Sequence, residues 1–150
     1  MGLKSKGDMA EIRKRIEQVK QRFNNATFNA LSKLGEEAIS LAKSIPPEVG
    51  FKDVTGNLRA SIGYSIYFNG EQRFSFFEGA GEGTQEGQNV SDEIIKDYPT
   101  GWVLIVVAGM SYAAAVESRG RDVLSSAENL VWLQMPSAMA KLENLVKRAK

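Results

Sequence analysis

The sequence of 150 residues contains no histidine and no cysteine. These absences exclude zinc sites with thiolate or imidazole ligands, iron–sulfur clusters and disulfide bonds. They also exclude nucleophilic pairs of serine or cysteine with histidine, and they remove the usual proton shuttle near neutral pH. An enzyme built from this sequence would have to work with carboxylates, lysine or tyrosine.

Charge and length set further limits. The 19 basic and 18 acidic side chains nearly cancel, which is unlike the strongly basic balance of a general nucleic-acid-binding protein. With 43% hydrophobic residues, a chain of this length can bury its own core, and we expect residues 1–150 to form a single domain. No secretory segment follows the first residues, and the longest apolar run, 102–108, is too short to span a bilayer. We therefore expect a soluble, intracellular protein without membrane association.

Apolar residues at alternating spacings of three and four predict a helix over residues 8–45. The stripe begins at Met9, and two prolines at 46–47 end it because proline lacks the backbone N–H. Uninterrupted, this helix would be about 57 Å long, which is longer than a compact domain of this size needs. Either the helix bends near Asn24 and Asn25, or its first half projects and finds a partner elsewhere.

Alternating apolar residues predict a β-hairpin over residues 62–77, with Asn69–Gly70 as its two-residue turn. A short helix ending near Ala60 precedes it. The apolar run within 101–109 predicts a buried strand. The expected fold class is α+β: a small antiparallel or mixed sheet packed by a long N-terminal helix and a C-terminal helix that begins at Ser125.

Four smaller predictions concern the second half of the chain. We expect a short helix over 111–117 and a short strand over 122–124. Ser125 and Glu128 have the spacing of a capping box at the start of the last helix. Pro136 should kink or split that helix.

Residues 78–99 combine four glycines and six acidic residues with a single lysine. They show little hydrophobic pattern, so we predict a flexible acidic loop inserted between strands. A phosphate-binding loop is excluded by spacing, because Thr84 and Glu86 stand where its last glycine would be. The S-x-x-K pattern at 40–43 lacks the supporting motifs of a serine–lysine hydrolase, and an ordinary helix surface explains it.

Basic residues gather at the two ends of the chain. Residues 3–22 carry seven basic and three acidic side chains, and residues 141–150 carry four and one. One interpretation is a plain solvated helix surface. The other is that the basic ends pair with the acidic segment 78–99 of another copy. The candidate interface residues are then Arg13, Lys14, Lys20, Arg22, Glu82, Glu86, Asp92 and Glu93.

Two polar residues, Arg59 and Glu117, stand in otherwise apolar patterns. A buried ion pair between them would explain both positions. Two independent surface residues would explain them equally well, and both interpretations stay open.

Two motifs follow each other along the chain. The first is Asp-Val-Thr-Gly-Asn-Leu-Arg-Ala-Ser-Ile at 53–62, and the second is Tyr-Ala-Ala-Ala-Val-Glu-Ser-Arg-Gly at 112–120. With the long N-terminal helix, they resemble the D-T-G-x-L-R-x-S-I and Y-A-x-x-V-E-x-G signatures of tail-completion proteins of tailed bacteriophages, also called head–tail joining, neck or minor tail proteins. The chain departs from this pattern by the extra Val54, by one extra residue before Gly120 and by the segment 78–99. The motif residues are Thr55, Gly56, Asn57, Leu58, Arg59, Ser61, Ile62, Tyr112, Ala113, Glu117 and Gly120.

The resemblance implies a structural virion-assembly protein of a siphophage-type phage or prophage, without enzymatic activity, cofactor or metal. It implies a ring at the head–tail junction, with head-closure, tail-terminator or tail-tube proteins as partners and DNA only passing through. The protein would be found in the virion, or in the host cytoplasm during assembly. Gly56 would form a turn, Leu58 and Ile62 would fill the core, and Tyr112 would pack. The alternative is a cellular protein- or nucleic-acid-binding module without catalytic activity.

Overall fold

The computed structural model describes residues 6–44, 57–79, 81–110 and 123–148. They form an α+β fold, which confirms the predicted class. The elements in chain order are α1 (Lys6–Ser44), α2 (Asn57–Ala60), β1 (Ile62–Phe68), β2 (Glu71–Phe77), α3 (Glu82–Ile94), the short 3-10 helix η1 (Ile95–Asp97), β3 (Trp102–Ala108) and α5 (Ser125–Arg148).

The three strands form one antiparallel sheet in the order β2-β1-β3. The predicted hairpin joins β1 to β2 through Asn69 and Gly70, whose φ angles of 51° and 81° are the positive values that a type I′ turn needs. On the other side of β1, β3 pairs in continuous register, from Ile62 opposite Ala108 to Phe68 opposite Trp102. The sheet therefore has β1 at its centre.

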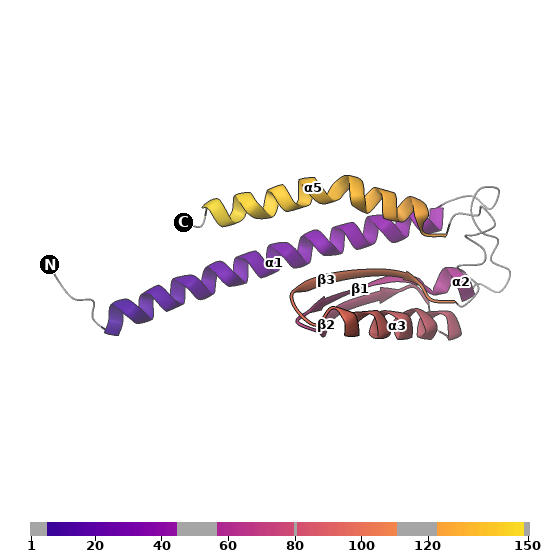
Figure 1. The fold of residues 1–150 in the computed structure, drawn as a ribbon, viewed down its shortest axis with the longest axis horizontal. Helices are drawn as coiled ribbons and strands as arrows, with labels where there is room; N and C mark the ends of the chain where they lie inside the picture. The colour runs from indigo at the N-terminus through magenta and orange to yellow at the C-terminus, as the bar shows by residue number, and fades with distance from the viewer. Residues whose placement is uncertain (1–5, 45–56, 80, 111–122, 149–150) are drawn as a thin grey trace.

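Helices cover both faces of the sheet, as Figure 1 shows. The longest helix, α1, packs on one face, and α5 runs antiparallel beside it. On this side the core contains Ile62 and Ile66 of β1 together with Ala38 and Ile39 of α1, all fully buried. The third long helix, α3, packs on the opposite face.

The N-terminal helix is continuous over 39 residues, about 58 Å. It passes through Asn24 and Asn25 without interruption, so of the two predicted alternatives the structure has the projecting helix. The side chains of residues 8–18 are all exposed. Figure 1 shows this first part of α1 extending past the sheet and past the end of α5.

The prediction of a flexible loop over residues 78–99 is wrong, because α3 and η1 occupy most of this segment. The residues that α3 buries are small: Gly83, Gly87 and Ser91, spaced four apart. A Cβ atom on Gly87 would lie 2.6 Å from the main-chain oxygen of Ser61 and would also meet the Phe77 ring. At these positions the helix packs through its own backbone, and with only Val90 and Ile94 as apolar contacts near its end it leaves little hydrophobic pattern in the sequence.

One prediction near the C-terminus also needs correction, because Val123 and Leu124 lie in a bend rather than in a strand. Of the two effects predicted for Pro136, splitting of the helix does not occur, because α5 is continuous through this residue. Since Pro136 is on the exposed side of the helix, water can hydrogen bond the carbonyl that the missing N–H leaves unpaired.

Candidate interaction surfaces

The first sequence motif forms the corner between α2 and β1. Leu58 and Ile62 are buried in the core, as expected. The Ser61 hydroxyl donates to the Leu58 carbonyl (2.7 Å) and accepts from the Met110 N–H (3.3 Å). The Ser61 carbonyl accepts from the Gly109 N–H (3.2 Å). These contacts join the start of β1 to the end of β3, so the described motif residues serve the fold.

Arg59 connects the same corner to the end of α1. Its Nη1 atom donates to the main-chain carbonyl of Lys43. Lys43, the lysine of the S-x-x-K pattern, places its Nζ atom 3.1 Å from Glu78 Oε2. The predicted partner of Arg59, Glu117, lies outside the described residues. The predicted helix 111–117 and the side chain of Asn57 also lie outside them, as do the motif residues Thr55, Gly56, Tyr112, Ala113 and Gly120.

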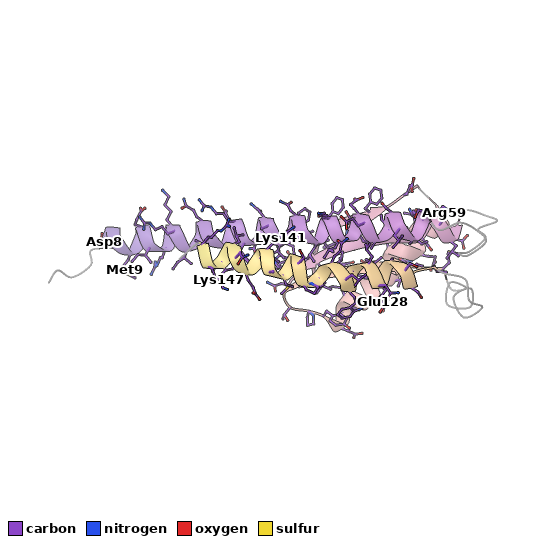
Figure 2. The ribbon with its side chains drawn as sticks, turned by 90° about the horizontal axis from the view of Figure 1, so that it is seen from above. Asp8, Met9, Arg59, Glu128, Lys141 and Lys147 are labelled. Carbon is purple, nitrogen blue, oxygen red and sulfur yellow. The ribbon has the colours of Figure 1, made fainter. Side chains whose placement is uncertain are left out.

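The first turns of α1, residues 6–22, form what we call the arm. In Figure 2, Asp8 and Met9 lie well beyond Lys147, which marks the end of α5. The arm exposes three large apolar side chains, with 46% of Met9, 40% of Ile12 and 51% of Ile16 accessible. The predicted basic interface residues are also on it, all exposed: Arg13, Lys14, Lys20 and Arg22.

The apolar stripe of α1 has the heptad spacing of a coiled coil. If Met9 is an a position, the a and d positions continue through α1 beyond the arm. The C-terminal end of α5 reaches this stripe at Val19 and Phe23, where Leu145 and Val146 lie beside them. No described element covers Met9, Ile12 or Ile16. The a and d residues are Met9, Ile12, Ile16, Val19, Phe23, Ala26 and Ala30.

An open apolar groove of about 660 Å³ lies between α1, β3 and α5. Its floor includes Thr27 and Leu31 of α1, and one wall is the Trp102 end of β3. The other wall is α5, where Trp132 and Met139 are 69% and 49% exposed. Exposed aromatic and methionine side chains around a groove are typical of surfaces that bind another protein.

The predicted acidic interface residues are on α3, on the opposite side of the sheet from α5 (Figure 1). Glu82 and Glu86 are exposed, and Glu93 pairs with Lys96 at 2.8 Å. Asp92 is also exposed, but its Oδ1 atom accepts a hydrogen bond from the Tyr67 hydroxyl of the same chain at 3.0 Å. The structure therefore does not bring the predicted basic and acidic residues together within one molecule.

A polar network fastens α3 to the sheet. The Gln88 amide accepts from the Ser75 hydroxyl and donates to Gln72 (2.7 Å) and to Asp92 (2.9 Å). Burial, assisted by the hydrogen bond to Asp92, raises the pKa of Tyr67 to about 12. The hydroxyl of Tyr67 therefore stays protonated at neutral pH and acts as a donor between the layers.

The α1 face has a simpler polar contact. The Tyr64 hydroxyl donates to Glu36 Oε1 at 2.8 Å. Burial, with this bond and the charge of Glu36, raises the pKa of Tyr64 above its ordinary value. Both tyrosines thus connect a helix to β1 as neutral donors.

Over residues 6–44, 57–79, 81–110 and 123–148, no cluster of three or more Asp or Glu side chains is arranged to hold a metal ion. Over the same residues, no helix is long and apolar enough to cross a membrane.

Comparisons of the chain with protein-family models, with curated proteins and with solved structures give no match. The resemblance to phage tail-completion proteins therefore depends on the two motifs and their order.

Sequence reasoning missed the groove and the exposed face of α5. Trp132, Met139 and Val146 stand seven residues apart, and this heptad spacing is the signal that could have revealed a second apolar stripe. The sequence predicts one apolar face of this helix through Val131, Leu142, Leu145 and Val146, so the second stripe overlaps that face at Leu142 and Val146. Because the buried face of α5 and its exposed stripe are adjacent, the apolar pattern of the sequence does not distinguish them.

Proposed function

We propose that this protein is a structural assembly subunit of a tailed phage or prophage, which joins head and tail as part of a tail-completion or neck ring. The observation that carries the proposal is the arm of α1, whose exposed Met9, Ile12 and Ile16 continue a heptad stripe that other elements cover further along the helix. Uncovered apolar residues of this kind favour a subunit that is completed by its neighbours.

The motifs supply the link to phage proteins. Leu58 and Ile62 lie in the core, and Ser61 joins β1 to the end of β3. A resemblance carried by such residues supports a shared architecture. It does not suggest a shared active site, which agrees with a role in which the protein presents surfaces.

The distribution of charge supports association between copies. The arm exposes several basic side chains, and the outer surface of α3 exposes Glu82 and Glu86. Opposite charges on separate surfaces attract two copies and orient them, while two arms repel each other. A contact between two different surfaces of identical subunits closes into a ring when the rotation between neighbours permits it.

The decisive experiment is removal of the gene from a phage or inducible prophage that carries it. We expect lysates of the deletion strain to contain DNA-filled heads and separate tails by electron microscopy. Adding the purified protein to that lysate should restore joined, infectious particles. Joined particles in normal number without the protein would contradict the proposal.

The basic arm also favours a second candidate, a nucleic-acid-binding module. Five arginine and lysine side chains are exposed between residues 13 and 22, which is enough for several phosphate contacts. Retention of the free protein on duplex DNA that weakens with a slope of about −0.9 per phosphate in log[salt] would support this candidate. Absence of retention at low salt would exclude it.

A further inference from the structure

Two apolar stripes of this chain match each other in spacing and length. They are exposed at Met9, Ile12 and Ile16 and at Trp132 and Met139. They meet within the chain where Val146 lies beside Val19 and Phe23. The arm stripe begins at Met9 and reaches Phe23, and the α5 stripe runs from Trp132 to Val146. Each alternates steps of three and four residues and covers two heptads, about 21 Å of helix. The α5 stripe forms a wall of the groove between α1, β3 and α5 through Trp132, which is 69% exposed.

The arm cannot fill the groove of its own molecule. The helix α1 is continuous from Lys6 to Ser44, and its later residues Thr27 and Leu31 form the floor of that groove. Figure 1 shows the arm pointing away from the sheet along the same axis. Only a groove in another molecule can receive it.

We propose that the arm of one copy docks in the α1–β3–α5 groove of a second copy, where Ile12 and Ile16 pack against Trp132 and Met139. This inference deepens the proposed function and rests on its premise that copies associate. It names the two surfaces through which they do so.

The charges beside the two stripes select this arrangement over pairing of two arms. With Met9 as an a position, the e and g positions from Arg13 to Arg22 are all basic, so two arms placed side by side repel each other. Asp8 is the one acidic g position before them. The acids Glu11 and Glu17 take c and b positions, away from the stripe. The basic e and g residues are Arg13, Arg15, Lys20 and Arg22.

The groove presents the opposite charge. Glu128 is the charged side chain that lines it among the described residues. Glu143 takes the e position beside Leu142 of the α5 stripe, while Lys141 and Lys147 take c and b positions outside it. A basic arm therefore meets acids along the edge of the groove.

The acidic surface of α3 is a poorer acceptor for the arm. Its exposed residues include Glu82 and Glu86, but Val90 and Ile94 pack against the sheet. No large apolar side chain is exposed on the described part of α3, so this surface could attract the arm but could not cover Ile12 and Ile16.

The contact joins two different surfaces, so every copy can give one arm and receive another. Such heterologous contacts produce a ring if the rotation between neighbours closes, and an open fibre if it does not. In a closed ring each copy makes the contact twice, which stabilises the assembly more than a single contact would.

Cysteine cross-linking tests the contact directly, because the natural chain contains no cysteine. One variant carries Ile12→Cys, and a second variant with a larger tag carries Met139→Cys. Mixed and mildly oxidised, they should form a disulfide-linked heterodimer on a non-reducing gel.

The matched control for Met139→Cys is Leu133→Cys, which is 82% exposed on α5 but lies outside the groove lining. It should cross-link to Ile12→Cys much less. Preferential linkage of Ile12→Cys to Glu86→Cys on α3, or to a second Ile12→Cys arm, would overturn the proposal. Absence of any linkage would do the same.

Association in solution gives a second readout. The double variant Ile12→Asp with Ile16→Asp should raise the concentration at which copies associate by roughly tenfold or more, because central apolar contacts dominate such interfaces. Its control, Gln18→Asp with Gln21→Asp, makes the same charge change at c and f positions and should associate like the natural protein. Sedimentation velocity measures both.

These outcomes separate the docking proposal from the proposed function. Circular dichroism checks that the Asp variants stay folded, as expected for exposed side chains. If cross-linking fails but the purified protein still joins heads to tails, only the docking contact is wrong. If the cross-link forms but the deletion strain assembles normally, only the phage role is wrong.

Discussion

The two faces of the sheet bind their helices by different means. On the α1 face, Ile62 and Ile66 of β1 are completely buried against apolar residues of α1. On the α3 face, Gly87 lets the helix backbone approach the sheet, and Gln88 and Asp92 connect to it through hydrogen bonds. Large apolar side chains of α1 stabilise the first face, whereas on the second face a smaller apolar cluster around Ile95, Ile105 and Val107 is joined by close backbone contact and a polar network.

This difference teaches why one helix was predicted and the other was not. Burial of large apolar residues leaves a periodic pattern, which the sequence displays along residues 8–45. Contact through Gly83, Gly87 and Ser91 leaves only a spacing of four between small residues. The sequence of a helix that packs in this way is therefore predicted to be a loop.

The largest expected effect is on the α1 face. Ile66→Ala removes a fully buried side chain from the central strand and should lower the free energy of unfolding by about 3 kcal/mol. Its neighbour Ser65 is on the α3 face, where Ser65→Ala removes the hydrogen bond to the Ser75 hydroxyl, so about 1 kcal/mol is expected there. Urea denaturation measures both. Equal losses would show that the two faces do not differ as described.

The next effect tests the close approach of α3. In Gly87→Ala the added Cβ would meet the Ser61 carbonyl oxygen, which as backbone cannot move aside easily. We expect a loss of about 2 kcal/mol in the free energy of unfolding. Glu86→Ala, an exposed neighbour on the same helix, should stay within about 0.5 kcal/mol of the natural protein. A neutral Gly87→Ala would mean that the helix does not need this contact.

A smaller loss is expected when the polar network of the α3 face is interrupted. Gln88→Ala removes the bonds to Ser75, Gln72 and Asp92 and should cost about 1.5 kcal/mol in the same denaturation measurement. Gln85→Ala removes a single exposed bond to Asn89 and is the matched control. If both variants lose the same stability, the network contributes no more than a surface bond.

The smallest effect is a pH dependence. The pKa of Tyr67 is raised from 10.0 to about 12 in the folded protein, so the unfolded chain releases this proton at lower pH. The contribution of the Tyr67 hydroxyl to the free energy of unfolding is therefore complete below pH 10 and is lost as the pH rises toward 12. Urea midpoints between pH 8 and 11 should fall less steeply in Tyr67→Phe. The slope should not vanish, because Tyr64 changes stability in the same direction. If the urea midpoint of Tyr67→Phe fell with pH as steeply as that of the natural protein, the raised pKa of Tyr67 would be contradicted.

The sequence by itself determined the elements whose signals are local. The spacing of apolar residues identified α1, β1, β3 and α5, and Asn69–Gly70 identified the hairpin turn, because positive φ is required at both positions. The candidate surfaces were foreseen only in part. The exposed basic side chains of the arm were predicted, but the groove between α1, β3 and α5 was not.

Only the tertiary structure decided how far α1 projects, that α3 is a helix, and that α5 leaves a second stripe exposed. Each of these depends on what lies opposite a residue, and a sequence pattern cannot supply that information. The helix α3 can lie close to the sheet at Gly87 because no side chain there would meet the Ser61 carbonyl oxygen and the Phe77 ring. Ile16 is exposed because α5 ends before reaching it, although its spacing from Val19 and Phe23 is the same as that between covered residues further along α1. Periodicity shows which side chains need a partner, and packing determines which of them have one within the chain.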